Sequence, residues 1–170
     1  MPSVKSKARQ VALCGLLVAL AFILSYVEAL VPINLGIPGV KLGLANLVVL
    51  IALYTLDLRW AFTISVVRIV LAGLTFGGLF SMLYSLAGGL LSFVVMALLS
   101  RKNLLGTVGV SICGGVAHNI GQLLMAMLVL ETQSVWYYFP VLLISGSVAG
   151  VLIGLLGGWM TGRVRKFLSR

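Results

Sequence analysis

The chain has 170 residues, of which 61% are hydrophobic and only 9% are charged, and its mean hydropathy is +1.20. These values exclude a soluble domain, which needs more charged side chains to cover a surface of this size. The net charge of +9 does not indicate nucleic acid as a partner, because the basic residues lie at the ends of apolar segments. We interpret them as topology signals and as contacts with membrane lipids.

Apolar segments about as long as a bilayer is thick recur along the whole chain. The first follows a short basic stretch, as in a signal peptide, but it is long enough to span and no convincing cleavage site follows it. We therefore predict an all-α integral membrane protein, a six-transmembrane-helix bundle that forms one domain over residues 1–170. The predicted helices cover residues 11–31, 40–56, 60–74, 79–100, 105–130 and 140–160.

The basic residues also predict an orientation. Ten of the twelve Lys and Arg residues fall at segment ends that share one side of the membrane with the two termini, and Lys41 and Arg68 are the two others. Since loops rich in Lys and Arg stay in the cytoplasm, we predict cytoplasmic termini and a multi-pass protein of the inner (cytoplasmic) cell membrane. A glycine-rich turn at Gly73–Gly78 and an aromatic loop at Glu131–Phe139 then lie outside.

A polar loop, Pro32–Asn46, separates the first two helices. Its prolines fix φ and its glycines allow tight bends, so the loop can hold the cation of Lys41 in a defined place. We expect it to close over a ligand site, with Asn34, Lys41 and Asn46 as candidate binding residues. Alternatively, Lys41 is a solvated loop lysine.

Two further charges lie close to this predicted site. Arg68 falls in the middle of the third helix, where a charge costs on the order of 2.5–3.5 kcal/mol, so it needs a partner inside the bundle. It is a candidate anion-binding group, or else a structural ion-pair partner of Glu28 or Asp57, or a side chain that snorkels along a tilted helix. Glu28, at the outer end of the first helix, is solvated at the headgroups or pairs with Lys41 or Arg68.

Polar residues on the fifth helix complete the candidate site. His118 and Gln122 are spaced i, i+4 and therefore share a face, and Asn119 follows His118. These side chains, flanked by Gly114 and Gly121, either line the ligand site or hold helices together. A single His without nearby acidic or thiol ligands is poor evidence for a metal site.

The chain lacks the motifs of several other functions. It has no ATP-binding loop, so energy for any active transport must come from an ion gradient or a partner. Its carboxylates are Glu28, Asp57 and Glu131 alone, which provide no catalytic pair, and both cysteines fall inside apolar helices. We expect a protein that is not an enzyme and that needs no cofactor.

Several blocks resemble the Gx transporter family, whose members are often labelled heptaprenyl diphosphate synthase component I. The most specific blocks are PGVKLGLAN at residues 38–46 and HNIGQ at residues 118–122. The resemblance extends from about residue 10 to 165 and includes segments 68–78, 85–92 and 138–146. It implies a substrate-binding S component of an energy-coupling-factor transporter, in which about six helices bind a vitamin or other micronutrient near the outer face.

Such proteins work with a transmembrane coupling subunit and two cytoplasmic ATPases, so the resemblance implies these partners and a small-molecule substrate. Many carry an Ala-xxx-Ala pair in the first helix that docks on the coupling subunit; here Gly15 and Ala19 occupy the nearest equivalent. The predicted ligand is small and anionic or amphipathic. The alternatives are a non-catalytic membrane subunit associated with heptaprenyl diphosphate (polyprenyl) synthesis and a stand-alone ion-coupled carrier.

Overall fold

The computed structural model describes residues 7–30, 43–102 and 105–168. Within this part of the chain every regular element is helical, which confirms the predicted all-α class. The longer helices are α1 (Lys7–Leu30), α2 (Asn46–Thr55), α3 (Leu58–Ala72), α4 (Gly78–Lys102), α5 (Thr107–Leu130) and α6 (Phe139–Leu168). Two short elements join them, the π-helical turn η1 (Gly73–Gly77) and the 3₁₀ helix η2 (Gln133–Tyr138).

Among the residues that the structure describes, four helical stretches are long and apolar enough to cross a membrane: Ala8–Leu30, Leu58–Lys102, Thr107–Leu130 and Gln133–Phe167. The second of these comprises α3, η1 and α4, whereas α2 is apolar but has only ten residues. The chain is therefore a multi-pass membrane protein. Its longest helix, α6, has 30 residues, which corresponds to about 45 Å at 1.5 Å per residue, close to the thickness of a bilayer with its headgroups.

Two of the predicted helix boundaries were wrong for physical reasons. The second helix was expected from residue 40, but among the described residues it begins only at Asn46, because Gly43 has a φ of +82° that no regular helix contains. The sixth helix was expected to end near residue 160 but continues to Leu168. Basic residues in this last part do not interrupt a helix, and near a C-terminus they favour it.

The predicted glycine-rich turn is present in a different form. Residues Gly73–Gly77 form one π-helical turn, and Gly78 follows with a φ of +71°. Phe76 of this turn packs against two rings of α1, with centroid distances of 5.4 Å to Phe22 and 5.3 Å to Tyr26. The turn is thereby anchored to the first helix.

The helices α4, α5 and α6 pack closely because glycines face one another. A Cβ at Gly121 of α5 would lie 2.6 Å from the carbonyl oxygen of Ala87 in α4, and a Cβ at Gly150 of α6 would lie 2.5 Å from the Cα of Ile112 in α5. Such small residues let helices approach in a membrane, where lipid is as apolar as the helix surface. The larger apolar core of the described residues lies around α2, which is almost completely buried, and includes side chains of all the other long helices.

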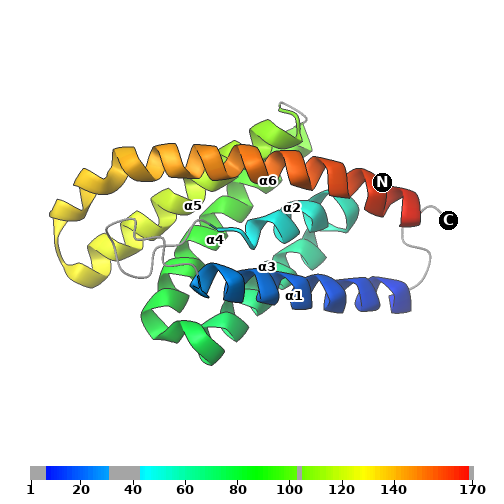
Figure 1. Cartoon of the computed structure of the whole chain (residues 1–170), viewed down its shortest axis with the longest axis horizontal. Helices are drawn as coiled ribbons and strands as arrows, with labels where there is room; N and C mark the ends of the chain where they lie inside the picture. Colours follow the sequence, from blue (N-terminus) through cyan, green and yellow to red (C-terminus); the bar gives the residue numbers. More distant parts are fainter. Residues whose placement is uncertain (1–6, 31–42, 103–104, 169–170) are drawn as a thin grey trace.

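Figure 1 shows that α1 and α6 run in opposite directions, with the beginning of α1 and the end of α6 at the same end of the molecule. There the guanidinium of Arg9 donates to the carbonyl oxygen of Phe167 at 2.9 Å. Basic residues Arg59, Arg101 and Arg165 line a pocket of about 520 Å³ that also includes the end of α2. Arg9, Arg59, Arg101 and Arg165 thus lie where the sequence predicts the cytoplasmic side, whereas Arg68 is buried inside the bundle.

Candidate functional site

A cluster of buried polar side chains lies inside the bundle. Its members come from α1, α2, α3 and α5, which are otherwise apolar, and each is at most 9% exposed. Burial of polar groups in a membrane protein is costly unless they are paired, and it marks functional positions. The cluster, called here the polar cluster, consists of Glu28, Asn46, Arg68, His118 and Gln122.

The link between α2 and α3 is a hydrogen bond from the guanidinium of Arg68. Its Nη2 donates to Oδ1 of Asn46 at 3.0 Å, and both side chains are buried. Asn46 occupies the first turn of α2, where helix geometry turns its side chain toward α3. The Nε atom of Arg68 has no hydrogen-bond partner in the part of the chain that the structure describes, so the guanidinium retains capacity to donate to a ligand.

The link to α1 is made by Glu28. Its Oε1 accepts a hydrogen bond from the backbone N–H of Gly43 at 2.5 Å. The carboxylate also interacts electrostatically with the buried Arg68 guanidinium. Of the pairings that the sequence left open for Arg68, the structure therefore favours Glu28 over Asp57, which lines the pocket at the basic end.

Gly43 occupies the centre of the polar cluster. A Cβ at this position would lie 3.0 Å from Nδ2 of Asn46 and 3.2 Å from Cδ2 of His118. Its carbonyl oxygen accepts a hydrogen bond from the N–H of Asn46 at 2.8 Å. The left-handed backbone of Gly43 therefore places one peptide against α1, α2 and α5 at once, which a residue with a side chain cannot do without strain.

Two consecutive glycines of α4, Gly88 and Gly89, also border the polar cluster. A Cβ at Gly88 would lie 2.7 Å from the carbonyl oxygen of His118 and 2.9 Å from Cγ of Gln122. The neighbouring Gly89 faces α3, where a Cβ would lie 3.9 Å from Nη2 of Arg68. The absence of side chains here lets α4 pack directly against the polar cluster.

The other predicted binding residues lie elsewhere or outside the described residues. Asn119 points to α6, where its Nδ2 donates to the carbonyl oxygen of Leu142 at 2.6 Å and to Oγ of Ser145 at 3.2 Å. This geometry matches the helix-packing alternative for Asn119, and its role in ligand binding stays a prediction. Asn34 and Lys41 lie outside the residues that the structure describes.

The predicted docking pair lies on the outer surface of α1. Gly15 and Ala19 are both exposed, and a Cβ at Gly15 would meet no atom within 4 Å. Leu16, in the same part of α1, is 66% exposed. Small residues with open space beside them are available to a partner helix, although the pair's role in docking is untested.

Sequence reasoning missed the part that glycines play in this site. Gly43 and Gly88-Gly89 fall in segments of the family resemblance, residues 38–46 and 85–92, but none of them was a candidate site residue. Glycine adopts a positive φ more readily than any other residue, so a glycine shortly before a helix is compatible with a left-handed turn. Which side chains such a turn meets depends on tertiary packing, which one sequence does not give.

The polar cluster contains groups that can bind a ligand. It offers a guanidinium, an imidazole and two amides as donors and acceptors, with one carboxylate to balance the charge. Among the described residues no three His, Cys, Asp or Glu side chains come together in a way that would hold a metal ion. A small polar or anionic group fits these side chains.

A family model described as heptaprenyl diphosphate synthase component I matches residues 17–160. The match spans most of the chain and includes every member of the polar cluster. No curated protein and no solved structure matches the chain.

Proposed function

The chain belongs to the heptaprenyl diphosphate synthase component I family, and within it we propose that this protein is the substrate-binding membrane subunit of an importer of the energy-coupling-factor type. The observation that carries the proposal is the polar cluster itself. Arg68 and Asn46 are hydrogen-bonded in the interior of an apolar bundle, against Gly43 and His118. Burying a charged side chain inside a membrane bundle costs free energy, so such a residue is interpreted as functional by default.

The proposed ligand is small and anionic or amphipathic. Arg68 supplies the cation, and Asn46, His118 and Gln122 supply hydrogen bonds from the surrounding helices. Lys41 and Asn34, from the loop before α2, are proposed to add contacts on the outer side. Glu28 reduces the net positive charge, which favours a ligand with one acidic group over a multiply charged one.

We propose six membrane crossings with cytoplasmic termini in the inner membrane. Support comes from Arg9, Arg59, Arg101 and Arg165, which gather at one end of the described part, because loops rich in such residues stay inside. At the other end, Trp136 stacks on Phe139 with a centroid distance of 4.9 Å, as expected for an aromatic belt.

The proposed partners are a transmembrane coupling subunit and cytoplasmic ATPases. The chain has no nucleotide-binding loop of its own, so a partner has to hydrolyse ATP. The exposed pair Gly15 and Ala19 on α1 is proposed to dock on the coupling subunit through close helix contact.

The test is binding by purified protein. Native mass spectrometry of gently solubilised protein is expected to reveal a co-purified small molecule, and the variants Arg68→Ala and Lys41→Ala to lose it without unfolding. Arg165→Ala is a matched control, because it removes a cation at the basic end. If both site variants retain the molecule as the control does, the proposed site is wrong.

The family description supports a second candidate, a non-catalytic membrane subunit associated with heptaprenyl diphosphate synthesis. A catalytic role is not proposed, because prenyl diphosphates are held through Mg²⁺ by clustered carboxylates, and the chain has only three acidic residues. Affinity purification separates the candidates. Recovery of ATPase subunits supports the importer, whereas recovery of a soluble prenyltransferase supports the second role.

A further inference from the structure

One face of α6 continues from an apolar groove into a cationic pocket. The groove, about 710 Å³, lies between α6 and residues Leu24, Leu44 and Leu47 of the first half of the chain. The pocket, about 550 Å³, lies farther along α6. On α6 the groove is lined by Val141, Ile144, Ser145, Val148, Ala149, Leu152, Ile153 and Leu156, and the pocket by Trp159, Gly162, Arg163, Lys166 and Phe167.

The two hollows share a helix face. The lining positions 141, 145, 148, 152, 156, 159, 163 and 166 follow one another at intervals of three or four residues, which places them in one row along a helix. The groove is almost entirely hydrocarbon, and the pocket follows toward the basic end of the molecule. Along the row, from Val141 to Lys166, the lining side chains therefore change from apolar to cationic.

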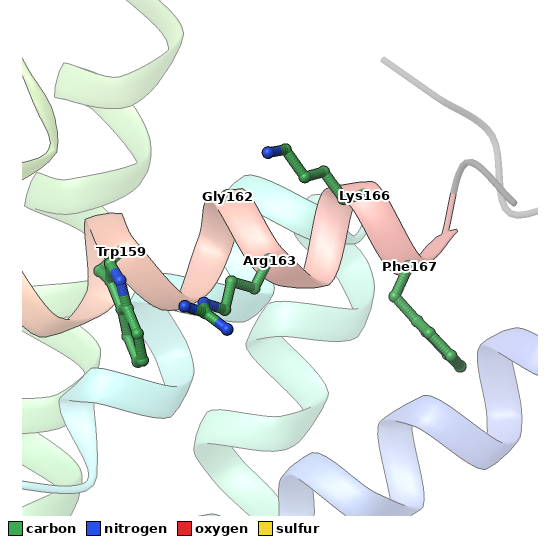
Figure 2. Close-up of a pocket in the computed structure, with 5 residues that line it drawn as sticks. All are labelled: Trp159, Gly162, Arg163, Lys166 and Phe167. Carbon is green, nitrogen blue, oxygen red and sulfur yellow. The ribbon is translucent and has the colours of Figure 1, made fainter.

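The pocket is formed by specific contacts. The Arg163 guanidinium lies over the Trp159 ring, 4.3 Å from its centroid, and Arg9 of α1 lies 5.3 Å from the centroid of Phe167. Figure 2 shows Trp159 and Arg163 next to each other, Phe167 extending toward α1, and Lys166 at the opposite edge of α6. At Gly162, between them, a Cβ would meet no atom within 4 Å, so the helix surface is open there.

The row runs through the hydrocarbon core toward the basic end. The groove spans Val141 to Leu156, about 22 Å of helix, which fits within a hydrocarbon core of about 30 Å, so a chain that enters from the basic end lies along the part of the groove nearest that end. The pocket occupies the last turns of α6, where Trp159 has the position of an interfacial anchor. Arg163 and Lys166 therefore lie at the level of lipid headgroups.

We propose that this face of α6 binds one anionic phospholipid of the leaflet at the basic end. Its phosphate occupies the pocket that Gly162, Arg163 and Lys166 line, and an acyl chain lies along the groove. Among the described residues, the lining of the pocket contains two cations and no carboxylate, so a headgroup with net negative charge is preferred to a zwitterionic one. The site is independent of the ligand held by the polar cluster.

Fluorescence of Trp159 tests the proposal in intact protein. Replacing the other two tryptophans, Trp60→Phe and Trp136→Phe, leaves Trp159 as the reporter. The protein is reconstituted in phosphatidylcholine vesicles that contain phosphatidylglycerol or phosphatidylcholine brominated near the glycerol. Brominated phosphatidylglycerol is expected to quench at a mole fraction about five- to tenfold lower, because each cation near the surface attracts anionic lipid. Equal quenching by the two lipids overturns the proposal.

Two matched pairs of variants separate a defined site from general attraction. Gly162→Leu fills the open surface, and Arg163→Gln/Lys166→Gln removes the local cations. Both variants are expected to abolish the stronger quenching by brominated phosphatidylglycerol. Gly15→Leu, at another open glycine, and Arg101→Gln/Lys102→Gln, with the same loss of charge on α4, are expected to retain it. If the α4 pair lowers the preference as much as the α6 pair does, the attraction is diffuse and the site does not exist.

Discussion

Arg68 and Asn46, separated by 22 positions in the sequence, join through a hydrogen bond of 3.0 Å inside the bundle. The bond connects the interior of α3 to the first residue of α2, close to the Gly43 peptide that donates to Glu28. The charge in this apolar interior is therefore held by a neutral amide acceptor from α2 and by its electrostatic interaction with Glu28 of α1. The arrangement ties the geometry of a candidate binding site to the start of α2.

The first prediction concerns this bond. Asn46→Ala leaves a buried guanidinium without one acceptor, and it is expected to destabilise the protein by about 1.5–3 kcal/mol. The double variant Arg68→Met/Asn46→Leu, made in a Glu28→Gln background so that no buried carboxylate loses its cation, replaces both partners by apolar groups and should recover most of this stability. Unfolding in mild detergent measures both effects.

Ligand binding distinguishes structural and functional roles for the same pair. The double variant is expected to remain folded but to lose the bound molecule, because the cation is gone. Asn119→Ala is the control, since it removes a buried amide that bonds to α6 and not to Arg68. Purely additive stability effects of the single Arg68→Met and Asn46→Leu variants would show that the pair does not couple.

The second prediction concerns the left-handed turn. Gly43→Ala is expected to cost more than Gly106→Ala, because Gly43 has a φ of +82° whereas Gly106 has a φ of −66° that alanine adopts freely. The positive φ costs about 1–2 kcal/mol, and only at Gly43 would the new Cβ also approach Asn46 to 3.0 Å, since a Cβ at Gly106 would meet no atom within 4 Å. Thermal unfolding ranks the two variants. Ligand binding adds a second criterion, because of the two variants only Gly43→Ala should weaken it. If the two variants unfold at the same temperature and bind the ligand equally well, Gly43 has no central role.

Much of the fold could be predicted because hydrocarbon length and charge placement are local properties of the sequence. Segment 105–130 was expected as a helix, and α5 covers Thr107–Leu130. The boundary at Asn46 was missed because the apolar pattern continues through Gly43, whose φ is set by contacts with Glu28 and His118. A pattern of hydrophobicity does not contain such contacts.

The candidate site could be predicted less completely. Arg68, Glu28 and His118 were identifiable because polar groups in apolar helices are rare, and the structure brings them together around Gly43. Asn119 has the same polarity but faces α6, because successive residues on a helix point about 100° apart. Which neighbour a helix face meets is decided by packing, so His118 and Asn119 could not be separated from the sequence.

The third prediction concerns the contact of α4 with α5. Gly88→Val is expected to destabilise the protein by several kcal/mol, because its Cβ would lie 2.7 Å from the backbone oxygen of His118 and helices cannot separate without exposing the polar cluster. Gly158→Val is the control; its Cβ would make ordinary contacts of 3.8 Å with Thr107. Both are assayed by the fraction that remains folded on heating in detergent. Similar losses would mean that the glycine pair of α4 is not a packing element.

The fourth prediction concerns the end of α2. Arg165 of α6 donates to the carbonyl oxygen of Tyr54 through Nε at 3.0 Å and Nη2 at 2.8 Å. Arg165→Met is expected to cost less than about 1 kcal/mol, because the side chain is exposed and water can replace its hydrogen bonds. Arg165→Lys, which keeps the charge, should recover part of the loss. A cost as large as that of Asn46→Ala would show that the basic end, rather than the polar cluster, holds α2 in place.

The last prediction concerns orientation. Leu105 lies between α4 and α5 at the basic end and is 43% exposed, whereas Tyr137 lies in η2 and is 87% exposed. In a protein whose native Cys14 and Cys113 are replaced by Ser, Tyr137→Cys is expected to react with a membrane-impermeant thiol reagent added to intact cells. Leu105→Cys is expected to react only after the membrane is opened, because loops rich in Lys and Arg stay inside. Neither substitution removes a charge, so the topology signal is unchanged. The opposite labelling pattern would place the basic end outside and would invert the proposed importer, whose coupling partner requires that end in the cytoplasm.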